Sequence, residues 1–153
     1  MKALELKIPP PIVALCVALL MWLTTRVIAP FDVPHGLRLG AALALGCVGL
    51  VLDLAGLFLF VQAKTAINPL KPGSATSLVS TGIYRATRNP MYLGLLLILL
   101  GWATFLANGL AYLIAPLFVL YINRFQIDPE ERVLLQKFGP SFSAYKTKVR
   151  RWL

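Results

Sequence analysis

The sequence has few charged residues, and few of those are acidic. Charged side chains make up 14% of its 153 residues, only 6 are aspartate or glutamate, and 58% of the chain is hydrophobic. Soluble domains carry about 25% charged residues to cover their surface. The low charge therefore excludes an ordinary soluble domain, and the mean hydropathy of +0.75 indicates an integral membrane protein.

Cysteine and histidine are also scarce. Cys16 and Cys47 lie inside apolar stretches with no CxxC or Cys/His spacing, and His35 is the single histidine. We therefore interpret both cysteines as small buried hydrophobic residues, and we expect neither a disulfide nor a metal site.

Continuous apolar stretches are abundant, and they do not alternate with polar residues as the strands of a barrel would. The stretches approach the roughly 20 residues that cross a hydrocarbon core. They cover residues 11–29, 37–63, 90–107 and the shorter 109–123. The sequence thus predicts an all-α, multi-pass protein with four transmembrane helices in one membrane domain, residues 1–153. The turn residues Asn108-Gly109 predict a tight hairpin between the last two spans.

The net charge of +9 is sorted by side. Four spans place both termini on one side, and that side holds most of the basic residues. They are Lys2, Lys7, Lys64, Lys71, Arg85, Arg88 and the basic residues between 124 and 151, against Arg26 and Arg38 on the other side. The positive-inside rule predicts cytoplasmic termini and a cytoplasmic loop 64–89. The charge therefore indicates membrane sidedness, with no nucleic acid as partner.

The tail, residues 129–151, is charged and periodic. Asp128 as N-cap, Pro129 at the first helical position and Gly139 as a stop predict one helix, and a second follows from Ser141. In the second helix Phe142, Tyr145, Val149 and Trp152 share a stripe among basic residues. This pattern is typical of an amphipathic helix at a cytoplasmic membrane surface.

Residues 74–94, "SATSLVSTGIYRATRNPMYLG", join the polar loop to the third span. Asn89 followed by Pro90 predicts an N-cap and a proline at the first helical position. Such a helix start offers free N–H groups and a positive dipole end, which together form an anion site. The alternative is plain capping, with Arg85 and Arg88 reaching the lipid headgroups.

Glu130 and Glu131 are expected at the same interface, because the tight hairpin returns the chain beside the third span. A capping box explains Glu131 better than Glu130. A carboxylate beside a helix N-terminus suits a ligand that carries both an ammonium and a carboxylate, such as S-adenosylmethionine.

Asp53 lies well inside the second span, where an ionisable residue is costly and indicates function. Gly46, Gly49 and Gly56 share its face and would bring a neighbouring helix close. Two interpretations stay open: a buried aspartate that is protonated or hydrogen-bonded to a neighbour, and a residue that relays protons or couples ions.

The second half of the chain resembles the isoprenylcysteine carboxyl methyltransferase family and the related membrane phospholipid N-methyltransferases. The resemblance covers residues from about 65 to the end, and its motifs keep their order and spacing around the hairpin. The matching positions are Leu78-Val79, Gly82, Tyr84, residues 88–94, Glu130-Glu131, Leu134, Phe138-Gly139, Phe142 and Tyr145.

The resemblance implies an S-adenosylmethionine-dependent methyltransferase that takes a membrane-embedded or lipid-like acceptor from the bilayer. It assigns cofactor binding to Thr76, Ser77, Leu78, Val79, Tyr84, Asn89, Pro90, Met91, Tyr92, Glu130 and Glu131. Thr76 and Asn89 depart from the family pattern, which commonly has histidines there.

The acceptor side departs further. Gln126 stands where the family's substrate-side arginine is expected, so the candidates on that side are Arg124, Gln126, Arg85 and Arg88. A carboxylate acceptor is best bound by a guanidinium, so the choice between O- and N-methylation stays open. The catalytic residues and the oligomeric state also stay open. The alternative functions are a small ion- or proton-coupled transporter that uses Asp53 and a non-catalytic member of the family.

Overall fold

The structure, a computed structural model, describes residues 4–65 and 68–153, and the chain is helical there, without strands. The all-α fold class is therefore confirmed. The α-helices are α1 (Pro10–Thr24), α2 (His35–Gln62), α3 (Pro90–Leu106), α4 (Gly109–Ile122) and α5 (Asp128–Lys148). Short turns of other helix types are η2 (Pro72–Ser74), η3 (Gly82–Arg85) and the π-helical η4 (Asn123–Ile127). Lys2 lies outside the described residues.

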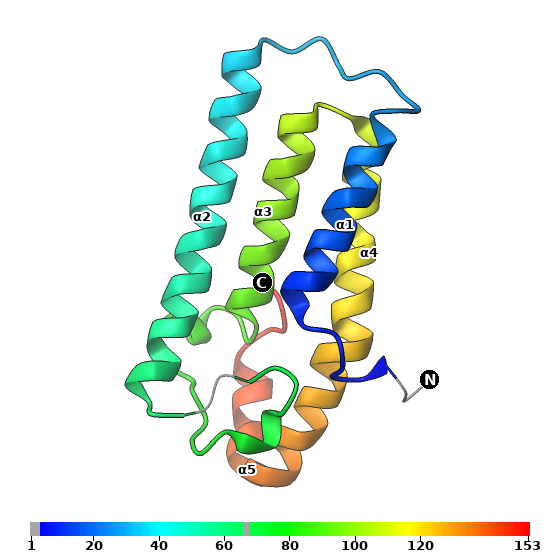
Figure 1. Cartoon of the computed structure of the whole chain (residues 1–153). Helices are drawn as coiled ribbons and strands as arrows, with labels where there is room; N and C mark the ends of the chain where they lie inside the picture. Colours follow the sequence, from blue (N-terminus) through cyan, green and yellow to red (C-terminus); the bar gives the residue numbers. More distant parts are fainter. Residues whose placement is uncertain (1–3, 66–67) are drawn as a thin grey trace.

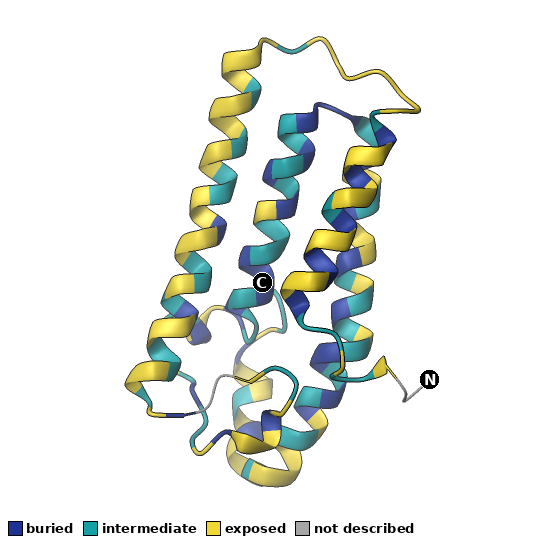
Figure 2. Cartoon of the chain, in the orientation of Figure 1, coloured by how far each residue is buried: buried dark blue, intermediate teal, exposed yellow. Residues whose placement is uncertain are grey.

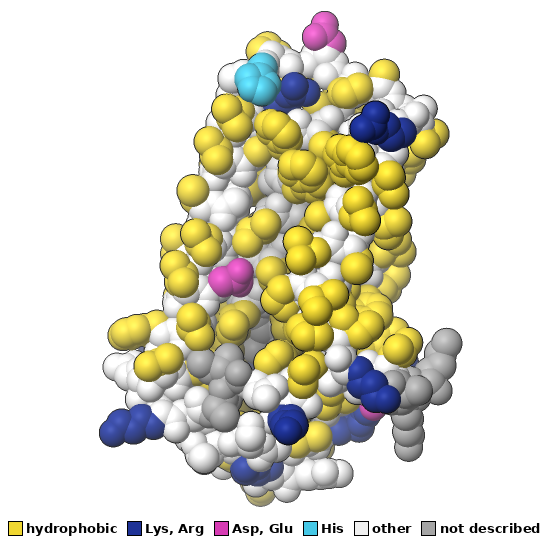
Figure 3. All heavy atoms as spheres, in the orientation of Figure 1, with side chains coloured by type: hydrophobic (Ala, Val, Ile, Leu, Met, Phe, Trp, Pro, Cys, Tyr) yellow, Lys and Arg dark blue, Asp and Glu magenta, His cyan; other side chains and the backbone are white. Residues whose placement is uncertain are grey.

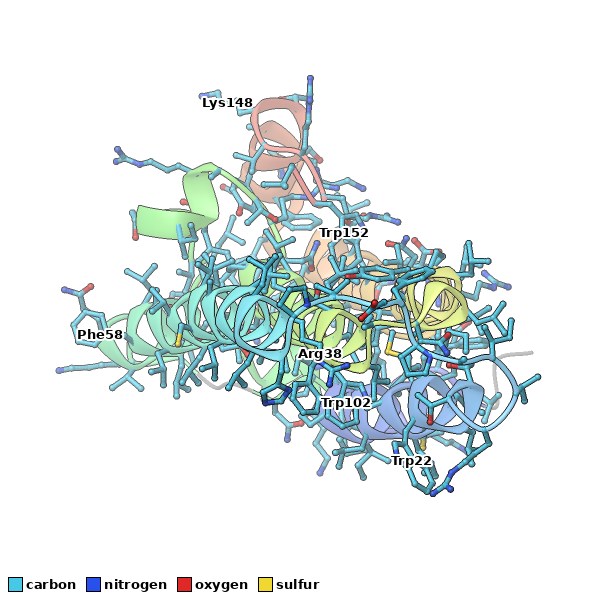
Figure 4. The ribbon with its side chains drawn as sticks, turned by 90° about the horizontal axis from the view of Figure 1, so that it is seen from above. Trp22, Arg38, Phe58, Trp102, Lys148 and Trp152 are labelled. Carbon is cyan, nitrogen blue, oxygen red and sulfur yellow. The ribbon has the colours of Figure 1, made fainter. Side chains whose placement is uncertain are left out.

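Helices α1 to α4 stand side by side, and α5 gathers with η2 and η3 at one end (Figure 1). Helix α3 is central, because it packs against α1, α2 and α4. Helix α2 buries only Gly49 and Gly56, and Figure 2 shows most of its surface exposed. Seen from above, Trp22 of α1 and Phe58 of α2 project away from the other helices (Figure 4).

The outward faces of these helices are strongly apolar. Helix α2 and the continuous helix Gly109–Lys148 are each long and apolar enough to cross a membrane, whereas α1 and α3 are apolar but only 15 and 17 residues long. Cys16 and Cys47 lie on these faces as free, exposed residues. The interpretation of both as buried was wrong, because apolar side chains of a membrane helix can face lipid as readily as protein.

The first predicted span, residues 11–29, is longer than the helix found there. Helix α1 ends at Thr24, and a turn follows. The hydroxyl of Thr24 donates to the carbonyl of Met21 at 2.6 Å, and that of Thr25 donates to Trp22 at 2.7 Å. These side-chain bonds take carbonyls that a longer helix would use, and so they favour an end here.

The hairpin between α3 and α4 is confirmed. Asn108 is the N-cap of α4, and its Oδ1 accepts from the N–H of Leu110 at 3.0 Å. Asn108 is fully buried, and its Nδ2 donates to the carbonyl of Ile28 at 2.8 Å. One side chain thus caps α4 and ties the turn to the end of α1.

Helix α5 begins at Asp128, but the prediction of Asp128 as its N-cap was wrong. The backbone of Asp128 is helical, and α4 runs through the π turn η4 into α5 without a break. Pro129 has no N–H to give to the carbonyl of Phe125, and that carbonyl instead accepts from the N–H of Leu6 at 2.9 Å. The wider π turn and this outside donor let the helix pass the proline.

Gly139 breaks α5 as predicted, with φ 48° and ψ −121°, and the second limb turns back toward α3. Phe142 on this limb is only 2% exposed. The hydroxyl of Tyr145 donates to the carbonyl of Tyr84 at 2.7 Å. The apolar stripe of the tail therefore packs on the loop before α3.

Candidate functional site

The loop between α2 and α3 is anchored by Thr65. Its Oγ1 accepts from the N–H of Thr76 at 2.8 Å and from that of Ser77 at 3.3 Å. Further along, Gly82 has φ +56°, and a Cβ there would lie 2.8 Å from a methyl carbon of Leu59. The glycine of the G-x-Y motif is thus required both for its conformation and for its close contact with α2. These features hold Tyr84 against the end of α2.

Helix α3 starts at Pro90 as predicted, but Asn89 does not cap it with its side chain. The Nδ2 of Asn89 donates instead to the carbonyl of Arg151 at 2.8 Å, and the Asn89 N–H donates to Thr87 Oγ1 at 3.1 Å. The prediction of Asn89 as a side-chain cap was therefore wrong. The first turn of α3 has no side-chain cap, and its N–H groups can face a ligand.

Glu131 is the centre of a charged cluster that we call the Glu131 clamp: Glu131, Arg88, Lys146 and Arg151. The carboxylate of Glu131 lies 2.8 Å from Arg88 Nη2, 2.9 Å from Arg151 Nη2 and 3.0 Å from Lys146 Nζ. Burial alone would raise the pKa of Glu131, but the hydrogen bonds from Arg151, Arg88 and Lys146 lower it to about 2. Arg88 also donates to the carbonyls of Val149 and Lys146, at 2.5 and 3.2 Å. The clamp thereby holds the end of the chain on the start of α3.

Glu130, the preceding residue, has a different environment. Its Oε2 accepts from the hydroxyl of Tyr92 at 3.1 Å. Burial raises the pKa of Glu130 to about 7, the charge of Glu131 adds to that rise, and the hydrogen bond from Tyr92 opposes it. Burial likewise raises the pKa of Tyr84 far above its usual range, with the charges of Glu130, Tyr145 and Asp53 contributing. Glu130, Tyr92 and Tyr84 are thus polar side chains that face the same space.

That space is a cavity of about 420 Å³ between α2, the polar loop, the start of α3 and α5. Most of its wall is apolar, as in small-molecule sites of similar volume. The predicted cofactor residues that line it are Ser77, Leu78, Val79, Tyr84, Asn89, Met91, Tyr92, Glu130 and Glu131. Thr76 and Pro90 are not among the residues of the wall. The Leu-Val, G-x-Y and α3-start segments thus meet at one cavity.

The predicted substrate-side residues divide differently. Arg88 lines the cavity, but its guanidinium is held by the clamp. Arg85 and Arg124 are exposed and lie outside the wall. Gln126 is fully buried elsewhere, and its Nε2 donates to the carbonyl of Ile8 at 2.6 Å. Among the described residues, the cavity wall therefore has no basic side chain that is free of protein partners.

Asp53 also lines this cavity, which the sequence did not indicate. The approach of α2 to α3 brings it there, because Gly94 leaves space for the Asp53 carboxylate and a Cβ at Gly94 would overlap Oδ1. Other lining residues that sequence reasoning missed include Pro10, Pro11, Leu54, Leu57 and Asn68. The sequence signal that could have placed Asp53 at the cavity was Gly94. This small residue of the matched motif lies opposite the glycine-rich face of α2.

Comparisons with known proteins identify the family of the chain. The model of a family described as phospholipid methyltransferase matches residues 37–141. A Haemophilus influenzae protein described as uncharacterized is 57% identical over 63 residues, which are 41% of this chain and 100% of that protein. The protein-S-isoprenylcysteine O-methyltransferase of Schizosaccharomyces pombe is 30% identical over 109 residues, which are 71% of this chain and 46% of that enzyme. No solved structure matches.

The family match covers α2, the polar loop, α3, α4 and the first limb of α5, which include most of the cavity wall. The likeness to the S. pombe protein is in keeping with this family. The chain belongs to the phospholipid methyltransferase family.

Proposed function

We propose that this protein is an S-adenosylmethionine-dependent methyltransferase that acts on a membrane-embedded or lipid-like acceptor. The observation that carries the proposal is the cavity at the start of α3, where Glu130, Tyr92 and the uncapped first turn meet. The family match supports the reaction class, and the apolar helices support a membrane setting.

The residues present fit the cofactor's chemistry. Glu130 is a carboxylate for an ammonium group, and the first turn of α3 offers N–H groups and a positive dipole end for a carboxylate. Leu78, Val79 and Met91 supply apolar wall for the remaining part. S-adenosylmethionine would supply the methyl group, and the protein would contribute mainly by positioning donor and acceptor and by excluding water.

We propose further that α1 to α4 are four membrane spans of one domain and that the cavity faces the cytoplasm. Figure 3 shows apolar side chains over the flank, with basic side chains toward both ends. The end with α5 holds most of the chain's basic residues, which favours the cytoplasmic side under the positive-inside rule. An acceptor would then reach the cavity laterally from the bilayer.

The test is binding of S-adenosylhomocysteine to the detergent-purified protein by isothermal titration calorimetry. We expect saturable binding, about 30-fold weaker in Glu130→Gln because a hydrogen bond to a charged group is lost. Asp32→Asn, the same loss of charge at an exposed loop residue, should bind like the wild type. Absence of binding to the wild type would refute the proposal.

Transfer itself is tested by incubating the protein with labelled S-adenosylmethionine and a total membrane extract. We expect label in an extractable lipid or lipidated fraction. Cofactor binding without any label transfer would instead support the non-catalytic alternative.

A further inference from the structure

Asp53 is the only acidic residue in α1 to α4. Its Oδ1 is buried without a hydrogen-bond partner in the described part of the chain. The carboxylate takes no part in the ion pairs of residues 4–65 and 68–153, which all involve Glu5, Asp128 or Glu131. Asp53 as a whole is half-buried, and a buried, unpaired carboxylate oxygen costs stability. The structure of the protein alone therefore gives no reason to keep an acid at this position.

The packing around Asp53 leaves room for it specifically. Gly94 lies against the carboxylate, and Gly49 lies against the carbonyl of Gly94, so the two helices meet at small residues. One turn further along α2, a Cβ at Gly56 would lie 3.4 Å from the hydroxyl of Tyr84. Asp53 is thus held on the α2 side of the cavity, near Tyr84.

The charges of the cavity favour a positive ligand. Asp53 and Glu130 both line it. Arg88 is the basic residue among the described lining residues. Its guanidinium donates hydrogen bonds to Glu131 and to two backbone carbonyls. A carboxylate placed beside Asp53 would meet a like charge and, among the described lining residues, no free basic side chain, and like charges at close range cost several kcal/mol.

The surroundings of Asp53 suit the polar end of an amphipathic molecule. Leu54 and Leu57 of α2 and Pro10 and Pro11 at the start of α1 line the same cavity. A lipid chain could therefore lie along apolar wall while its polar end meets the carboxylate.

We infer, on the basis of the proposed function, that Asp53 binds the polar end of the methyl acceptor and selects an ammonium group over a carboxylate. Glu130 would serve the cofactor's ammonium, so the two acids have separate ligands. The Asp53 carboxylate can also take the proton that an ammonium must lose before its nitrogen lone pair is free to react. Asp53 thereby supplies the acceptor side with a proton acceptor.

The experiment measures binding without cofactor, using decylammonium and decanoate, which share the same chain length. Both are titrated into the detergent-purified protein by calorimetry. We expect the wild type to bind decylammonium at least tenfold more tightly than decanoate. Asp53→Asn, which keeps the side chain's shape, should weaken decylammonium binding about 30-fold. The matched change Asp32→Asn, in the exposed loop after α1, should leave it unchanged.

Equal affinity of the wild type for the two probes, or an unchanged decylammonium affinity in a folded Asp53→Asn protein, would overturn the inference. S-adenosylhomocysteine binding in the same preparations reports folding and separates this inference from the proposed function. Cofactor binding without ammonium selectivity refutes only the role of Asp53, and ammonium selectivity without cofactor binding refutes only the methyltransferase. If Asp53→Asn does not fold, the ratio of the wild type's affinities for decylammonium and decanoate tests the inference.

Discussion

Glu130 and Glu131 are neighbours on α5, yet their surroundings are opposite. Glu131 binds three basic side chains, and its pKa falls to about 2. Among the described residues Glu130 has the Tyr92 hydroxyl as its one hydrogen-bond partner, and burial raises its pKa to about 7. Successive residues of a helix point about 100° apart, so one carboxylate enters the clamp and the other enters the cavity wall.

The difference separates residues that hold the fold from residues that remain for a ligand. The Glu131 clamp satisfies its charges inside the protein and fixes residues 149–151 on the start of α3. Glu130 and Asp53 have few partners among the described residues, and acidic groups that are buried without partners cost stability. Perturbed and unpaired groups of this kind cluster at functional sites.

The largest effect should come from breaking the clamp. Glu131→Ala leaves Arg88, whose side chain is 11% exposed, buried without its carboxylate. Removing one partner of a buried ion pair costs about 4 kcal/mol, and chemical unfolding in detergent would measure the loss. Glu5→Ala is the control, because Glu5 pairs with the half-exposed Arg132, and such surface pairs contribute about 0–1 kcal/mol. Equal losses in the two variants would contradict the role of the clamp.

The two glutamates should also give stability opposite dependences on pH. Glu131 has a folded pKa of about 2 against an ordinary 4.5. Its contribution, about 3 kcal/mol by linkage, is complete above pH 4.5 and is lost as the pH falls toward 2. Glu130 has a folded pKa of about 7. Its contribution, also about 3 kcal/mol, is complete below pH 4.5 and is lost as the pH rises through 7.

Unfolding measured from pH 2 to pH 8 tests this contrast. The free energy of unfolding should rise up to about pH 4.5 and then fall toward pH 7. Glu131→Gln should flatten the low-pH arm, and Glu130→Gln should reduce the slope of the high-pH arm. A Glu130→Gln protein that keeps the full high-pH slope would show that Glu130 is not the buried acid responsible.

A double-mutant cycle should show that the clamp acts as a unit. Arg88 and Glu131 are in direct contact at 2.8 Å, so the effects of Arg88→Met and Glu131→Gln should not add. We expect a coupling energy of about 2 kcal/mol, measured from the unfolding of both single variants and the double variant. The pair Glu131 and Lys137 is the control, because Lys137 donates to the carbonyl of Gly73 instead of joining the clamp. Additive effects of the Arg88 and Glu131 changes would mean that their contact is not stabilising.

Local signals predicted the helices and the turn at Asn108 from the sequence, because capping and apolar length depend on nearby residues. The continuous α4–α5 helix was not predictable in this way, since the free carbonyl of Phe125 is satisfied by Leu6, far away in the chain. The same holds for the site. The motifs identified Glu130 and Glu131 together, but the separation of their roles depends on Arg151, which the break at Gly139 returns to the cluster. The place of Asp53 depends on how α2 packs on Gly94.

The smallest predicted effect concerns the hydrogen bond between Tyr92 and Glu130. Tyr92→Phe removes the hydroxyl that donates to Glu130 Oε2 at 3.1 Å. That bond favours the charged carboxylate, so its loss should raise the pKa of Glu130 further. The high-pH arm of the stability curve should then extend to higher pH. The cost above pH 7 should be about 1 kcal/mol. Tyr112→Phe, which loses a hydroxyl contact with Thr104 at the far end of the bundle, should leave the arm in place. An unmoved arm in Tyr92→Phe would mean that this hydrogen bond does not govern the protonation of Glu130.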